Sequence, residues 1–200
     1  MTDGDWAGIL GAGALAIAAT DVDDLLLLTA FFANPRWRPG AVVAGQMLGI
    51  LVLVVAGLAA ARLLLVFPAP WVGLLGFVPI VIGVRELVED DEEDGVSESV
   101  QGAPSVHPAL AVAAVTIANG ADNIGVYVPL FTAQGPSASV ALAAVFLALA
   151  GAWCWLAWRI ATHPRIAAPV RRWLPRFMPW ALMAAGVYVL LAMGTPSLVF

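Results

Sequence analysis

The chain has 200 residues, of which 62% are hydrophobic and 12% are charged, and its formal net charge is −5. A soluble domain is usually about half apolar and about a quarter charged. This composition excludes an ordinary soluble domain and indicates an integral membrane protein. The alternation of a membrane barrel is absent, so we expect the membrane-crossing segments to be helices.

Six apolar helices are predicted in chain order, separated by breaks that contain Pro or Gly. They cover about residues 6–33, 41–66, 70–88, 108–133, 137–161 and 177–195. The predicted fold is therefore an all-α membrane protein. Its parts are a first transmembrane repeat (1–88), an acidic loop (89–107) and a second transmembrane repeat (108–200).

The first predicted helix contains the polar stretch ATDVDDL at residues 19–25, inside an otherwise apolar segment. An ionised carboxylate at the centre of a bilayer costs about 2.5–3.5 kcal/mol on insertion scales. Because packing does not explain such a cost, these carboxylates must meet a cation, share protons or line water.

The second predicted helix carries Gln46 within the stretch GQMLG at residues 45–49. Gly at positions four apart is typical of a helix-packing face. We expect Gln46 to form an interhelical hydrogen bond, with an accessory role toward a cation or a proton as the alternative.

The acidic loop holds seven of the 14 acidic residues, between Glu89 and Glu98. A calcium loop of the EF-hand type is rejected, because Gln101 stands where a bidentate Glu is required. A solvated loop is predicted, and weak collection of metal ions is the alternative.

The fourth predicted helix repeats the acidic pattern as ANGADNI at residues 118–124, 99 positions after the first. Residues three or four apart share a helix face, and oxygen-rich sites suit six-coordinate divalent cations. The predicted metal ligands are the matched polar residues of the two motifs, with Asp21, whose counterpart is Gly120, and Gln46 as accessory or proton-pathway residues. The ligand set is Thr20, Asp23, Asp24, Asn119, Asp122 and Asn123.

Two neighbours of this second motif have alternative interpretations. Gly120 either loosens the helix, which exposes backbone carbonyls as ligands, or permits close helix packing. We expect the Thr116 hydroxyl to bond the backbone of its own helix.

The orientation follows from the arginines, since the chain contains no Lys. Eight of the nine lie in the first, third and fifth loops or beside them, and Arg62 lies on the other side. Cytoplasmic loops are enriched in basic residues, which places both termini outside and the acidic loop inside. A repeat of three helices re-enters the membrane from the opposite face, so we predict an inverted-topology repeat with a midplane site.

Both motifs, together with the stretches FFA at 31–33, GQMLG at 45–49, LGFVPI at 75–80 and TIANGADNIGVYVPLF at 116–131, resemble the cadmium resistance transporter family. That family lies within the LysE-type exporter superfamily. The resemblance implies a multi-pass exporter of divalent metal in the inner membrane, with cadmium as the named substrate and no enzymatic activity. Cadmium is soft, however, and this site offers only oxygen, so manganese, calcium or zinc is an alternative cargo.

The expected partners are the lipid bilayer, the transported ion and protons, with no nucleic acid and no tightly bound cofactor. Without Lys the chain has no Walker lysine, so coupling to an ion gradient is expected. An exporter of an amino acid or another small solute is the alternative. A membrane enzyme would need a nucleophile or a His cluster, and a scaffold would not need buried carboxylates. Small-residue faces suit either internal packing or a homodimer.

Overall fold

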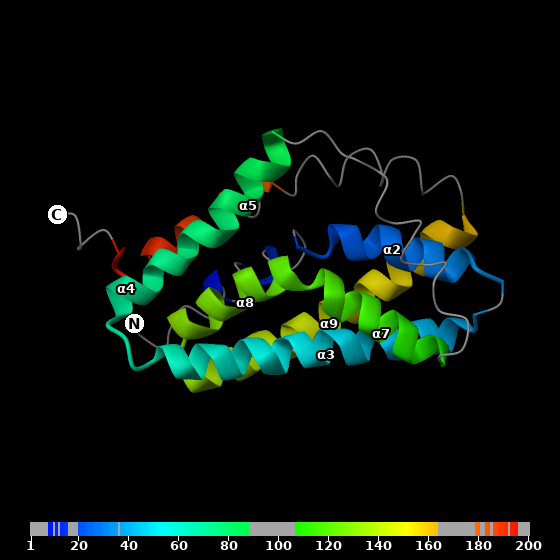
Figure 1. Cartoon of the computed structure of the whole chain (residues 1–200), viewed down its shortest axis with the longest axis horizontal. Coiled ribbons are helices and arrows are strands. Elements are labelled where there is room, and N and C mark those ends of the chain that lie inside the picture. Colours follow the sequence, from blue (N-terminus) through cyan, green and yellow to red (C-terminus); the bar gives the residue numbers. More distant parts are fainter. Residues whose placement is uncertain are drawn as a thin grey trace.

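The computed structural model describes residues 8–9, 11, 13–15, 20–35, 37–88, 107–163, 179–180, 183–184, 186–191 and 193–195. The elements with defined bounds in these residues are all helical (Figure 1). They are α2 (Val22–Ala33), α3 (Pro39–Leu64), α4 (Ala69–Gly73), the 3-10 turn η1 (Leu74–Gly76), α5 (Phe77–Val88), α7 (Pro108–Asn119), α8 (Ala121–Ala133) and α9 (Pro136–Thr162). The acidic run 89–98 lies outside the described residues, and the predicted helix 177–195 is described only in the short pieces given above.

Helices α3 and α9 are the two long, apolar helices of the fold. They have 26 and 27 residues, which at 1.5 Å per residue gives about 40 Å, more than the hydrocarbon core of a bilayer. Each begins with Pro at the first helical position, where the fixed φ of Pro suits a helix start. The predicted helices 41–66 and 137–161 are thereby confirmed.

The predicted helices that carry the motifs are not continuous. Helix α7 and the segment Asp122–Ala133 meet at a bend of 70°, and helix α2 begins at Val22, directly after a turn residue at Asp21. By length and composition the described residues provide two helices that can cross a membrane, or three when the bent pair forms one span. The predicted helix 70–88 consists of α4, η1 and α5. Six spans remain a prediction.

The buried apolar residues form two clusters at opposite ends of α3 and α9. One joins α2 with the beginning of α3 and the end of α9 through Phe31, Val42 and Ile160. The other joins the second half of α3 with α8 and the first half of α9 through Val54, Phe131 and Phe146. Successive helices therefore run back and forth between the two ends, as the predicted loop arrangement requires.

Close packing between α3 and α7 depends on two glycines. A Cβ atom at Gly49 would lie 2.6 Å from Cβ of Thr116, and one at Gly45 would collide with the carbonyl oxygen of Ala109. The GQMLG face is thus used for packing within the chain, one of the two uses expected for it.

The packing across the two sequence halves is reciprocal. Helix α2, from the first half, packs on α9 of the second, while α8, from the second half, packs on α3 of the first. Gly76 and Gly186 are also reciprocal, because a Cβ at either would meet the backbone carbonyl oxygen of the other. In Figure 1, α2, α7 and α8 lie along the two long helices α3 and α9.

Candidate metal site between the two motifs

A buried chain of hydrogen bonds joins three helices at the first motif. The hydroxyl of Thr116 in α7 donates to Oε1 of Gln46 in α3 over 2.5 Å. The Nε2 group of Gln46 in turn donates to Oδ2 of Asp24 in α2 over 2.7 Å. The side chain of Asn119 also hydrogen-bonds Asp24. The expectation that Thr116 bonds its own helix backbone is therefore wrong, because the close α3–α7 contact brings the Gln46 amide within its reach.

The directions of these bonds make Oδ2 of Asp24 a hydrogen-bond acceptor. Because a hydroxyl donor occupies Oε1 of Gln46, the amide presents its N–H groups to Asp24. Oδ2 of Asp24 must then accept, as an oxygen of either an ionised or a protonated carboxyl group can. Thr116, Gln46 and Asp24 are 2%, 2% and 4% exposed, so a charge-bearing group is held inside the protein by amide donors from both sequence halves.

The second motif is arranged differently. Asp122 is half-buried and its Oδ1 accepts the backbone N–H of Asn123 over 2.8 Å, in the first turn of α8, where the helix dipole favours a negative charge. The side chain of Asn123 is buried, yet its Oδ1 has no hydrogen-bond partner among the described residues.

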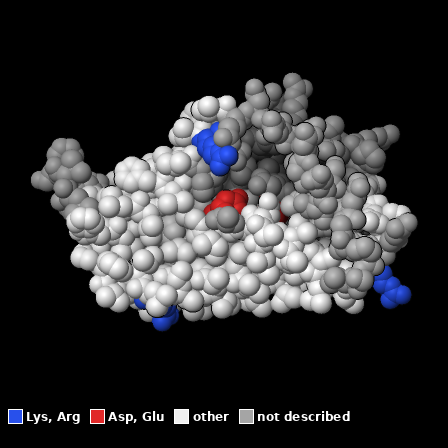
Figure 2. All heavy atoms as spheres, viewed as in Figure 1, with Lys and Arg blue, Asp and Glu red and all other residues white. Residues whose placement is uncertain are grey.

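Carboxyl groups from both motifs lie within electrostatic range of one hydroxyl. Asp21, Asp24 and Asp122 all interact electrostatically with the hydroxyl of Tyr127, which is itself fully buried in α8. Asp21 and Asp24 also interact electrostatically with the free thiol of Cys154. Figure 2 shows acidic atoms at the floor of a hollow near the middle of this face. The two motifs thus share one region of the protein.

The backbone breaks of the two motifs match. Asp21 has φ −87° and ψ 13°, and its counterpart Gly120 has φ −83° and ψ 21°. These angles are accessible to any residue, so conformation does not require Gly at position 120. Gly120 instead permits close packing, because an added Cβ would have to displace the methyl groups of Leu53 in α3. Both interpretations of Gly120 therefore hold in part: the helix is interrupted, and the interruption packs tightly.

The structure brings part of the predicted ligand set together. Thr20 and Asp21 are buried beside Asp24, and Asn119, although exposed, reaches Asp24 from α7. The side chain of Asp23 lies outside the described part of the chain. Among the side chains that the structure describes, no three from His, Cys, Asp and Glu are close enough to hold a metal ion. The ligand set therefore stays a prediction.

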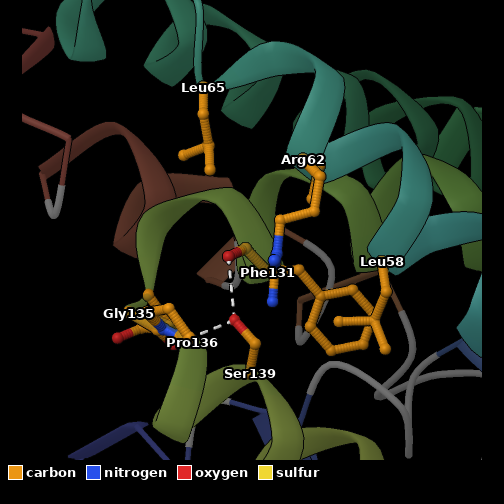
Figure 3. A pocket seen from close by; sticks show the side chains of 9 residues that line it. Leu58, Arg62, Leu65, Phe131, Gly135, Pro136 and Ser139 are labelled. Atoms are coloured by element: carbon orange, nitrogen blue, oxygen red, sulfur yellow. Dashed lines mark hydrogen bonds between the residues drawn. The ribbon is translucent and has the colours of Figure 1, made fainter.

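A separate cavity of about 140 Å³ lies at the other end of the molecule, where α3 ends and α8 turns into α9. Figure 3 shows Arg62 extending into it, while the Ser139 hydroxyl lies 3.1 Å from the carbonyl oxygens of both Phe131 and Gly135. Its lining residues include an arginine and no acidic residue, so this cavity does not suit a cation.

Sequence reasoning missed two features of the site. The Thr116–Gln46 bond depends on which residues two helices bring to their crossing, which spacing along the chain does not reveal. Tyr127 had a readable signal, because it follows Asn123 by four positions on an apolar helix.

Comparison with known proteins gives one result at the level of the family. No curated protein and no solved structure matches the chain. The family model described as cadmium resistance transporter matches residues 17–200, a range that includes both motifs and both long helices. The chain therefore belongs to the cadmium resistance transporter family.

Proposed function

We propose that this protein exports a divalent metal cation through a site between its two acidic motifs. Family membership supports a transporter of metal ions across a membrane. The observation that carries the proposal is the Asp24 carboxyl, which is buried, hydrogen-bonded by amides from both halves and close to the second motif. A buried carboxylate attracts a cation, and this attraction offsets the free-energy cost of removing the cation from water.

The proposed ligands are oxygen atoms from both halves. Asp23, Asp24 and Asp122 provide the charge, and Thr20, Asn119 and Asn123 provide neutral oxygens. Asp21 and Gln46 act beside them, as a proton-carrying residue and as the partner that orients Asp24. Carboxylate, amide and hydroxyl oxygens are typical ligands of hard divalent cations.

Coupling to protons follows from the ligands. Export against a membrane potential of 100 mV costs about 4.6 kcal/mol for two charges. Carboxylates must lose their protons before they bind metal, so protons and metal compete for one site. Protonation from outside would release the ion there, which makes the protein a proton antiporter.

Alternating access is proposed to arise from two inverted three-helix repeats. Support comes from the matched backbone breaks at Asp21 and Gly120 and from the reciprocal packing of α2 on α9 and of α8 on α3. In inverted-repeat transporters the site lies near the midplane, and one repeat moves against the other. The distribution of Arg residues supports both termini outside in a cell inner membrane.

The test is metal transport by purified protein in proteoliposomes, with Cd²⁺, Mn²⁺, Zn²⁺ and Ca²⁺ as separate cargo ions and an imposed pH gradient. Asp23→Asn and Asp122→Asn are expected to abolish flux of the transported ion. Asp90→Asn, the same change in the acidic loop, is the matched control and should leave flux unchanged. Flux like that of the wild type in both motif variants would refute the proposed site.

A further inference from the structure

Two buried oxygen atoms on one face of α8 lack hydrogen-bond partners within the described part of the protein. They are Oδ1 of Asn123 and the hydroxyl oxygen of Tyr127, in side chains that are 2% and 0% exposed. The two residues are four apart and therefore share a face of the helix. Buried polar atoms nearly always have a partner, and an exception points to a bound ion or water.

Packing alone holds the Tyr127 hydroxyl in place. The ring of Tyr127 lies 4.7 Å from that of Phe146 and 6.2 Å from that of Phe131, between ring centroids. The base of its side chain is also close to α3, since a Cβ at Gly57 would lie 3.1 Å from Cβ of Tyr127. The phenol oxygen is thus fixed in position although none of the described residues bonds it.

The surroundings of this oxygen favour a cation. Asp21, Asp24 and Asp122 all act on the Tyr127 hydroxyl, so carboxyl groups from both motifs place a negative field at this point. Helix α9, which packs against α8 and supplies Phe146, has no polar side chain between Val140 and Ala152. It offers these oxygens no protein partner of the kind that Gln46 provides to Asp24.

We propose that the amide oxygen of Asn123 and the hydroxyl oxygen of Tyr127 bind the transported divalent cation as neutral ligands, directly or through one water. The proposal rests on the proposed function and adds Tyr127 to its site. Oxygen ligands without charge raise the coordination number of a hard cation and bind it through their dipoles, without adding negative charge to the site. An exporter needs that combination, because the ion must be selected and then released.

The experiment uses Tyr127→Phe, which removes one oxygen and keeps the ring. The affinity of detergent-solubilised protein for CdCl₂, MnCl₂, ZnCl₂ and CaCl₂ is measured by calorimetry, together with thermal unfolding with and without metal. Affinity for the ion that binds is expected to fall about tenfold or more. Thermal stability without metal should stay equal or rise, because removing an unpartnered hydroxyl removes its desolvation cost. Asn123→Leu, which removes the other oxygen at similar volume, should weaken binding in the same way.

The other tyrosine of the chain provides a matched control. The Tyr188 hydroxyl accepts a hydrogen bond of 3.2 Å from Gln134, away from the motifs. Tyr188→Phe should therefore leave metal affinity unchanged. Tyr127→Phe with wild-type affinity would overturn this inference alone. Absence of binding of all four ions to the wild-type protein would overturn the proposed function and this inference with it.

Discussion

Asp24 and Asn123 occupy the same position in the two motifs, and their surroundings differ. Asp24 receives hydrogen bonds from Gln46 and Asn119, whereas Oδ1 of Asn123 receives none from the described residues. The charged residue is satisfied by the protein itself, and the neutral residue keeps its oxygen available. The comparison teaches that, at this position, the two similar motifs differ in role: the first presents a carboxyl group with protein partners, and the second presents a neutral amide oxygen with none among the described residues.

The difference arises in the neighbouring long helices rather than in the motifs. Helix α3 provides Gln46 to the first motif, while α9 is apolar from Val140 to Ala152 and provides no amide to the second. The backbone is nearly the same at Asp21 and Gly120. Local chain geometry is therefore shared by the two halves, and the polarity of the packing partner is not.

Exchanging the two side chains should have the largest effect. Asp24→Asn is expected to abolish metal flux in proteoliposomes, because it removes the buried charge. Asn123→Asp should also impair flux, because its carboxylate would lack an amide partner, and a buried unpaired charge costs several kcal/mol. The double variant keeps the total charge, and we expect it to remain inactive.

Recovery of flux in that double variant would contradict the conclusion that the surroundings of Asp24 and Asn123 differ in function, since total charge alone would then determine activity. Circular dichroism and the elution volume in detergent should confirm that each variant is folded. The Asp90→Asn protein is again the control for a carboxyl change outside the motifs.

Gln46→Leu makes the surroundings of Asp24 resemble those of Asn123, and its effect should be intermediate. The change leaves Asp24 with fewer donors and the Thr116 hydroxyl without its acceptor, so stability should fall by about 1–3 kcal/mol for each buried group left unsatisfied. Unfolding in denaturant measures the loss, and flux at several pH values tests whether the proton dependence moves.

Gln134→Leu is the matched amide change, at the far end of the molecule, where Gln134 donates to Tyr188. It should lose about 0.5–1.5 kcal/mol and leave the pH profile of flux unchanged. If both Gln variants shift the profile equally, Gln46 has no special relation to Asp24.

Thr116→Val should produce the smallest effect, because it removes only the outer bond of the chain. We expect a loss of about 1–3 kcal/mol in the free energy of unfolding, because one buried group, Oε1 of Gln46, loses its donor, with metal affinity close to that of the wild type. A loss of affinity as large as that of Gln46→Leu would show that the hydroxyl is needed to orient the amide.

The sequence allowed the helical class, the two long helices and the family to be predicted, because apolar length and ordered motifs are local signals. It also indicated Gln46 as an interhelical hydrogen-bonding residue. The partner of Thr116 was out of reach, since it depends on how helices cross. The four-residue spacing places Tyr127 on the face of Asn123, but the lack of a partner for its hydroxyl among the described residues again depends on the packing. The break at Asp21 was also missed, because no Gly or Pro marks it, whereas Gly120 gave a hint of its counterpart.

The crossing at Gly76 and Gly186 has a mechanical consequence. Where side chains interlock, as at Tyr127 and Phe146, rotating one helix against another separates well-packed surfaces and is resisted. At the glycine crossing, backbone meets backbone, with the Cβ position of Gly76 only 2.7 Å from the carbonyl oxygen of Gly186. Neither glycine has a side chain that must change rotamer when the two segments turn about this point. Rotation here would therefore disturb less side-chain packing than rotation at Tyr127 and Phe146.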